Sequence, residues 1–185
     1  MAHGGNVIEE LTEDHREVEA LFEQIQDTAM DGGRRRELAD RMTIELVRHS
    51  VAEEEYLYPA VRKHVEGGAG LADKELADHA DVERMLKDLE GAEPGQTEFE
   101  QTMTRLVQSV TEHVQDEEGR LFPLLRAACS AEQLQELGDK VRAAKEKAPT
   151  RPHPAAPDKP PANKLLGPGA GLVDRARDML SGRGR

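Results

Sequence analysis

The chain contains the stretch His49-Ser50-Val51-Ala52-Glu53-Glu54-Glu55-Tyr56-Leu57-Tyr58-Pro59 and repeats its pattern as His113-Val114-Gln115-Asp116-Glu117-Glu118-Gly119-Arg120-Leu121-Phe122-Pro123. Both copies read H-x-x-x-E-E-x-x-L-[YF]-P. On a helix, a histidine and a glutamate four residues apart lie one turn apart on the same face. Each copy can therefore direct an imidazole and a carboxylate to one point, and two copies that face each other would form a metal site.

The repeat extends beyond this motif. His15 and His79 are separated by 64 residues, as are His49 and His113, Glu53 and Glu117, and Pro59 and Pro123. The local sequence Asp14-His15-x-x-Val18-Glu19 likewise matches Asp78-His79-x-x-Val82-Glu83. The simplest explanation is a duplicated helical hairpin. Its two copies would pack as a pseudo-symmetric four-helix bundle, because neither hairpin can bury its apolar face alone.

Composition and hydrophobic periodicity favour an all-α protein. Aromatic residues make up 3% of the 185 residues and charged residues 34%, with no Trp, so the core must be aliphatic. Each of the first four helices carries one histidine within an apolar stripe. We predict an up-down four-helix bundle with a fifth helix, its helices lying at about 7–29, 34–65 with a break or kink at Pro59, 70–91, 97–126 and 131–147.

The tail differs in composition from the bundle. Seven of the ten prolines lie between residues 149 and 168, which predicts a stiff, extended linker over 148–170 after a domain that spans residues 1–147. Residues 171–185 are predicted to form a short amphipathic helix. Its apolar face would carry Leu172, Val173, Ala176, Met179 and Leu180. We expect this helix to dock on the bundle or to bind a protein partner, and not to insert stably in a membrane.

Charge is distributed unevenly along the chain. Residues 1–147 hold 18 basic and 34 acidic residues, a net charge of −16, whereas residues 148–185 hold seven basic and three acidic residues, a net charge of +4, which together give −12. The acidic domain makes nucleic acid an unexpected partner and would attract cations, although such an excess commonly serves solubility alone. Cys129 is the single cysteine, and no targeting or membrane-spanning segment is evident. We therefore expect a cytoplasmic protein.

Six residues are expected to point into one bundle core: His15, His49, Glu53, His79, His113 and Glu117. Buried, unpaired carboxylates are costly, so these groups must satisfy one another or bind a cation. Thiolate ligands are absent, and six nitrogen and oxygen donors exceed the needs of one tetrahedral zinc. Two iron ions are the first choice and manganese the second. Such a centre keeps net positive charge and would attract hydroxide, peroxide or reduced dioxygen.

This residue pattern resembles the hemerythrin-like family of HHE cation-binding domains over roughly residues 6–147. The family pattern H…HxxxE…H…HxxxE is present as His15, His49 with Glu53, His79, and His113 with Glu117. The resemblance implies a non-haem di-iron site with an oxo or hydroxo bridge, in which the two glutamates bridge the ions and the four histidines are terminal ligands. Oxygen-carrying members have a fifth histidine in an HxxxH pair on the third helix. Glu75 and Glu83 occupy the positions four residues before and after His79, which argues against reversible oxygen carriage.

Two further residues are candidates for the site. Glu75 stands where the other half of the repeat has the apolar Leu11, so it is either a ligand or a neighbour of one. Tyr56 follows Glu53 by three residues on the expected inner face, while its counterpart is Arg120. Two roles are equally compatible with the sequence for Tyr56: a phenolate ligand and a plain core tyrosine.

The leading functional hypothesis is a di-iron protein that binds or decomposes peroxide, dioxygen or nitric oxide, with a role in oxidative stress. Catalase-like removal of peroxide is one candidate activity, and the sequence assigns no catalytic residue to it. An iron or redox sensor, whose tail reports metal occupancy, is the alternative. A metal-free helical interaction protein is the third.

Overall fold

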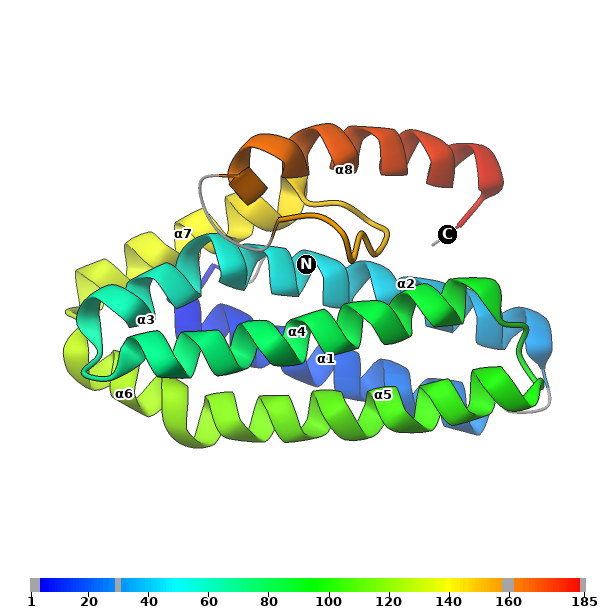
Figure 1. Ribbon diagram of the computed structural model, residues 1–185, viewed down its shortest axis with the longest axis horizontal. Coiled ribbons are helices and arrows are strands. Elements are labelled where there is room, and N and C mark those ends of the chain that lie inside the picture. Colours follow the sequence, from blue (N-terminus) through cyan, green and yellow to red (C-terminus); the bar gives the residue numbers. More distant parts are fainter. Residues whose placement is uncertain (1–3, 29–30, 158–161, 184–185) are drawn as a thin grey trace.

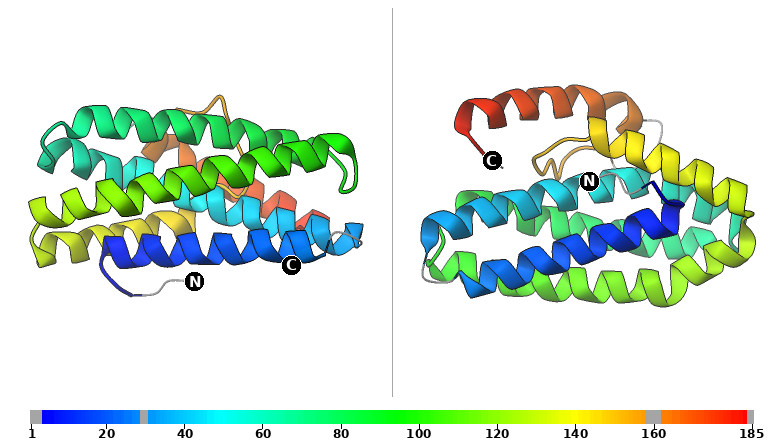
Figure 2. Two further views of the ribbon diagram at one scale, coloured as in Figure 1. Left: turned by 90° about the horizontal axis from the view of Figure 1, so that it is seen from below. Right: turned by 180° about the vertical axis from the view of Figure 1, so that it is seen from behind.

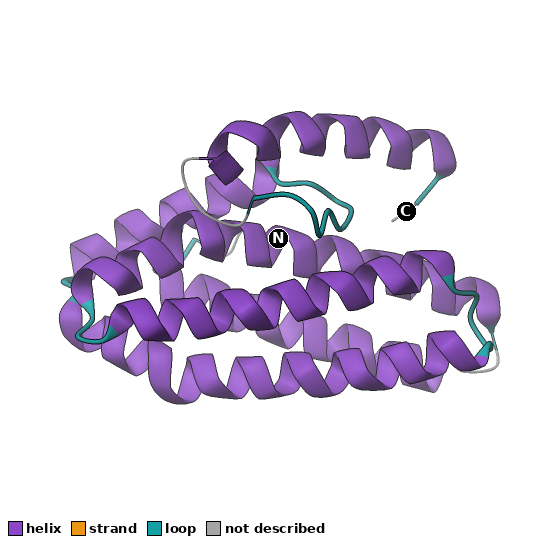
Figure 3. Ribbon diagram, viewed as in Figure 1, coloured by secondary structure: helices purple, strands orange, loops and turns teal. Residues whose placement is uncertain are grey.

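The computed structural model describes residues 4–28, 31–157 and 162–183, with the backbone alone for 165–167. Every regular element in these ranges is helical, as Figure 3 shows. The expected all-α bundle is therefore confirmed.

The first hairpin consists of α1 (Val7–Asp27) and α2 (Gly32–Ala52), which continues through the π turn η1 (Glu53–Leu57) into α3 (Tyr58–His64). Asn6 caps α1 by accepting hydrogen bonds from the amides of Ile8 and Glu9, and the Glu9 carboxylate accepts one from the Asn6 amide in return. The predicted end of this helix, at about Ala29, lies outside the described residues.

The second hairpin repeats this design. It consists of α4 (Gly68–Gly91) and α5 (Thr97–Asp116), which continues through the π turn η2 (Glu117–Leu121) into α6 (Phe122–Ala128). Figures 1 and 2 show the four long helices side by side, with the two hairpins lying against each other. The duplicated hairpin inferred from the 64-residue offset therefore corresponds to the two halves of the bundle.

The two π turns carry each long helix past its proline. In η1 the amide of Tyr58 donates to the carbonyl of Glu53, five residues earlier, and in η2 the amide of Phe122 donates to the carbonyl of Glu117. Pro59 and Pro123 then lie in the first turn of α3 and α6, where a missing amide hydrogen costs least. The helix path therefore continues beyond each proline.

The bundle core is divided into two hydrophobic clusters. One contains residues such as Val18, Met42, Leu86 and Leu106, and the other contains residues such as Leu11, Leu57, Leu76 and Leu125. The histidines of the motif fall between these clusters along each helix, so the polar site is enclosed at both ends by apolar packing.

A fifth helix, α7 (Ala131–Lys147), packs against α1 and α2 as predicted. Ser130 caps it in a capping box with Gln133. Leu134 and Val141 are buried against the bundle. Gly138 meets the Gly5–Val7 backbone so closely that an added Cβ would lie 2.6 Å from the Gly5 carbonyl oxygen. Only glycine permits this approach.

The final helix, α8 (Ala162–Ser181), begins earlier than predicted. The boundary between an extended linker to residue 170 and a helix from 171 is wrong, because the helix continues through Pro168. A proline removes one amide donor from a helix. Beyond Pro168, α8 packs on α7, where Gly171 lies so close that an added Cβ would be 2.4 Å from the Lys147 carbonyl oxygen.

The docked face of α8 is polar. Asp174 and Asp178 are buried, whereas Leu172, Val173, Met179 and Leu180 are 60–91% exposed. The expected apolar face therefore points to solvent while the helix docks through its acidic side. None of the described helices combines the length and apolarity that a membrane span requires.

Candidate metal centre

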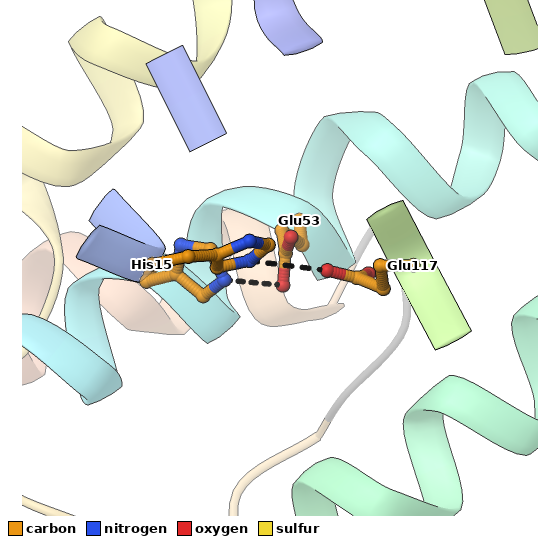
Figure 4. A group of neighbouring side chains, drawn as sticks. His15, Glu53 and Glu117 are labelled. Atoms are coloured by element: carbon orange, nitrogen blue, oxygen red, sulfur yellow. Dashed lines mark ion pairs between the residues drawn. The ribbon is translucent and has the colours of Figure 1, made fainter. Parts of the chain in front are cut away.

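Six buried side chains from all four long helices meet inside the bundle. His15 lies on α1, His49 on α2, His79 on α4 and His113 on α5, while Glu53 and Glu117 lie in the two π turns. All six are at most 6% exposed. Figure 4 shows His15, Glu53 and Glu117 converging from different helices. The structure thus brings together the whole set predicted from the sequence.

The two glutamates each connect both hairpins. Glu53 Oε2 lies 3.1 Å from His49 Nε2 and 3.3 Å from His79 Nε2. Glu117 Oε2 lies 3.4 Å from His15 Nε2 and 3.7 Å from His113 Nε2. Each carboxylate therefore faces one histidine of its own hairpin and one of the other.

The ligand atoms form several overlapping groups. In one group, each residue offers one ligand atom, and these atoms all lie within 4.8 Å of one another; its members are His15, His49, Glu53 and Glu117. A second group that meets the same limit contains Glu53, His79 and His113. Within each hairpin the two imidazole centroids are 4.9 Å apart. Glu53 belongs to both groups, so a carboxylate lies between the two histidine pairs.

The outer nitrogen of every histidine faces a carboxylate. His15 Nδ1 lies 2.8 Å from Glu118, His49 Nδ1 3.2 Å from Asp14, and His79 Nδ1 3.0 Å from Glu54. His113 Nδ1 lies 2.9 Å from Glu75 Oε2, an ion-pair contact in which neither atom makes a hydrogen bond. Such partners orient imidazoles and leave Nε2 free to bind a metal. Of these carboxylates, the sequence singled out only Glu75. The other carboxylates could have been found from the repeat, which pairs Asp14 with Asp78 and Glu54 with Glu118.

Glu75 breaks the two-fold pattern. The repeat pairs Asp14 with Asp78, yet Asp78 lies 3.8 Å from His113 Nδ1, and Glu75 takes the closer place. Glu75 is 1% exposed. It also forms a compact group with His113 and Glu117, so it can orient His113 or serve as a further ligand.

The tyrosine of the site is Tyr58 and not Tyr56. Tyr58 Oη lies 2.9 Å from His79 Nε2, 3.3 Å from Glu53 and 3.1 Å from Glu117. Tyr56 is only partly buried and lies outside the cluster, with Lys164 Nζ 3.9 Å from its ring centroid. The prediction assumed an unbroken α-helix. The π turn changes the phase, because the residue five positions after Glu53 now sits one turn above it.

Buried charges shift the pKa values of the cluster. Burial disfavours the imidazolium form, but nearby carboxylates outweigh it and raise the pKa of His49 and of His79 to about 10 and that of His113 to about 9. Burial is likewise outweighed at Glu53, where His49 and His79 hold the carboxyl pKa well below its usual range. In the metal-free protein, these histidines therefore carry protons on nitrogen atoms that a metal cation would otherwise occupy.

Some buried polar atoms of the cluster lack hydrogen-bond partners. Among the described side chains, Glu53 Oε1, Glu117 Oε2 and His15 Nε2 are buried without a hydrogen-bond partner. Unpartnered buried groups of this kind are costly and call for an explanation. A bound cation would satisfy all three atoms, so the residues present fit a metal.

A small inner chamber adjoins the four histidines. Its volume is about 20 Å³, and its other walls are mainly Val18, Leu46, Val82, Val110 and Val114. The walls follow the repeat, since His15 corresponds to His79, Val18 to Val82 and Leu46 to Val110. A chamber of this size holds about one water-sized molecule.

The fifth helix reaches the site through a partly buried lysine. Lys145 Nζ forms ion pairs with Asp14 and, at 3.1 Å, with Glu10, and Asp14 in turn faces His49. Burial opposes the charge of Lys145, but the two acids outweigh it and raise its pKa. Sequence reasoning missed Lys145, because its role depends on how α7 packs.

Known proteins match both the sequence and the fold. The family model for the hemerythrin HHE cation binding domain matches residues 6–125. An uncharacterized hemerythrin-like protein of Schizosaccharomyces pombe is 30% identical over 171 residues, which cover 92% of this chain and 84% of that protein. The tail is thus largely included in that match.

Two further relatives are informative. A crystal structure of a hemerythrin HHE cation binding domain-containing protein from Mycobacterium kansasii has a TM-score of 0.66 and 25% identity, covering 76% of this chain and 85% of that one. A DNA nickase of Nostoc sp. is 30% identical over 146 residues, 79% of this chain but 41% of that protein. Less than half of the nickase is therefore aligned.

Proposed function

The chain belongs to the hemerythrin HHE cation-binding family, and from this premise we propose that it binds two iron ions and acts on small oxygen species, hydrogen peroxide above all. The observation that carries the proposal is the sharing of Glu53 and Glu117 between two histidine pairs. Manganese is the weaker alternative, because four of the six donors are imidazoles, which suit iron better than manganese.

The ligands divide by hairpin. His15 and His49 would hold one ion and His79 and His113 the other, while Glu53 and Glu117 would bridge the two. When bound, the two ions would supply the electron transfer by which one peroxide is reduced to water and another is oxidised to dioxygen. The carboxylates at Nδ1 would keep each histidine in the tautomer and orientation that ligation requires.

The inner chamber supports a small ligand. Its volume of about 20 Å³ suits peroxide, dioxygen or nitric oxide and excludes larger molecules from direct contact with all four histidines. Its apolar walls exclude bulk water and favour neutral molecules.

Tyr58 would hold a proton beside the second histidine pair. Burial and the neighbouring carboxylates, Glu117 foremost, raise its pKa well above the usual value, so the phenol is neutral. Its hydroxyl is within hydrogen-bonding distance of His79, Glu53 and Glu117. A neutral phenol can donate to an oxygen atom in the cluster, which favours peroxide chemistry over simple carriage.

Metal analysis with a peroxide assay tests the proposal. Protein from iron-replete cells should contain about two iron ions per chain and should evolve dioxygen from hydrogen peroxide. Glu53→Gln should lose iron and activity. The matched control Glu55→Gln removes a neighbouring carboxylate that is outside the cluster and should keep both. Iron without turnover would contradict the peroxide activity, and protein free of iron would contradict the proposal altogether.

A further inference from the structure

A second cavity, here called the outer pocket, lies between α2, α4 and parts of two C-terminal segments, residues 149–157 and 163–170. Its volume is about 160 Å³. One wall is apolar and comes from the bundle, with Val47, Val51, Leu76 and Leu86. The opposite wall comes from the tail, with Pro149, Pro154 and Ala156 among its residues.

The tail forms a fixed roof over this pocket. The Arg151 guanidinium lies 3.2 Å from Glu90 of α4 and 2.6 Å from Asp178 of α8. The His153 amide donates to Glu83 of α4 at 2.7 Å, and the His153 ring lies 2.8 Å from Asp174 of α8. Figure 1 shows residues 149–157 as a loop between α8 and the bundle. Ion pairs on both sides therefore hold the roof in place.

The outer pocket adjoins the inner chamber. Ser50, His79 and Val82 line both cavities. Glu54, which faces Nδ1 of His79, also lines the outer pocket. The apolar pocket therefore ends at a histidine of the candidate metal centre.

Size and charge define the ligand. An apolar protein cavity of about 150 Å³ is known to accept benzene, so 160 Å³ accommodates a body of similar size. Among the described lining residues, Arg151, His153, Glu83 and Glu54 already interact with other protein groups. A neutral, mostly apolar molecule fits these walls better than a charged one.

We propose that the outer pocket binds the organic part of a small alkyl or aryl hydroperoxide, with its oxygen–oxygen head directed to Ser50 and His79. This inference rests on the proposed peroxide function and names a substrate class for the same centre. The overall reaction is balanced: the O–O bond of the hydroperoxide breaks with uptake of two electrons and two protons, giving an alcohol and water. Hydrogen peroxide supplies the two electrons and the two protons and is oxidised to dioxygen.

Binding can be measured without turnover. Cumyl alcohol has the carbon skeleton of cumene hydroperoxide but no peroxide bond, and its affinity for the full-length, metal-loaded protein is accessible by titration calorimetry. We expect a Kd of about 1 mM or tighter. Ala156→Phe fills the pocket from the roof and should weaken binding at least about tenfold. Ala155→Phe places the same ring on the adjacent residue, which does not line the pocket, and should leave binding unchanged.

The outcomes separate this inference from the proposed function. Failure of wild-type protein to bind cumyl alcohol, or equal binding by all three proteins at equal metal content, would overturn the pocket assignment even if hydrogen peroxide is consumed. Conversely, selective loss of binding in Ala156→Phe supports the pocket even if the protein turns over no peroxide. With an active protein and hydrogen peroxide as the reductant, Ala156→Phe should slow cumene hydroperoxide consumption at least about tenfold, whereas hydrogen peroxide supplied alone should be consumed at the wild-type rate.

Discussion

The hydroxyl of Tyr58 lies 2.9 Å from Nε2 of His79. The corresponding position in the first half of the site is occupied by Phe122, which stacks on His15 with centroids 5.8 Å apart and ring planes 2° from parallel. The duplicated site is therefore chemically asymmetric, because one histidine pair has a phenol beside it and the other has an apolar ring.

Tyr58→Phe tests this asymmetry. The variant keeps the ring but loses the proton donor, so we expect iron content to persist while peroxide turnover falls by about a hundredfold. Tyr56→Phe is the control and should remain within about twofold of wild type. Both are measured by oxygen evolution at equal iron loading. Full activity in Tyr58→Phe would remove Tyr58 from the mechanism.

Replacing Glu75 tests the orientation of His113. Glu75→Leu restores the apolar residue that the first half has at Leu11 and should lower affinity for one of the two ions by about 10–100-fold. Glu75→Gln keeps a polar side chain of the same shape beside His113 Nδ1 and should lose less. The amount of iron retained during dialysis against a chelator ranks the iron affinities of wild type and the two variants. If both variants retain iron like wild type, Glu75 has no role in binding.

The metal-free protein should lose stability as pH rises. The pKa values of His49 and His79 are raised from 6.5 to about 10 and that of His113 to about 9, so the folded state binds more protons than the unfolded chain between these limits. This stabilisation is complete below about pH 6.5 and is lost towards pH 10. Urea unfolding of chelator-treated protein from about pH 6.5 to 9.5 measures it.

Iron should reverse that dependence, because ligating histidines must first lose their protons. Iron affinity should therefore fall on acidification, and the extra stability that iron confers should grow as pH rises. A metal-free protein whose unfolding free energy does not change between about pH 6.5 and 9.5 would contradict the assignment of raised histidine pKa values.

Lys145→Met tests the link between α7 and the site. Removing the partly buried ammonium leaves the buried carboxylates of Asp14 and Glu10 without this partner and should cost about 2 kcal/mol of unfolding free energy. Lys140→Met on the same helix removes a lysine that pairs with exposed Glu136 and should cost less than about 1 kcal/mol. Urea midpoints of the two variants decide between a supporting role for Lys145 and none.

The sequence predicted the bundle and its six central residues because one repeat offset aligned a histidine on every long helix. It misplaced the tyrosine, since a constant helical period cannot register the phase change at Glu53–Leu57. It also placed the start of α8 too late, because Pro168 signals an interruption, yet the helix continues through it. Contacts such as Lys145 with Asp14 depend on helix docking, which local sequence does not encode.

Anomalous X-ray diffraction at the iron absorption edge, from crystals of protein expressed with sufficient iron, tests the central claim most directly. Two iron peaks are expected among the six ligands, one beside His15 and His49 and the other beside His79 and His113, with Glu53 and Glu117 between them. An absence of iron peaks, or a single metal site served by only one histidine pair, would contradict the account.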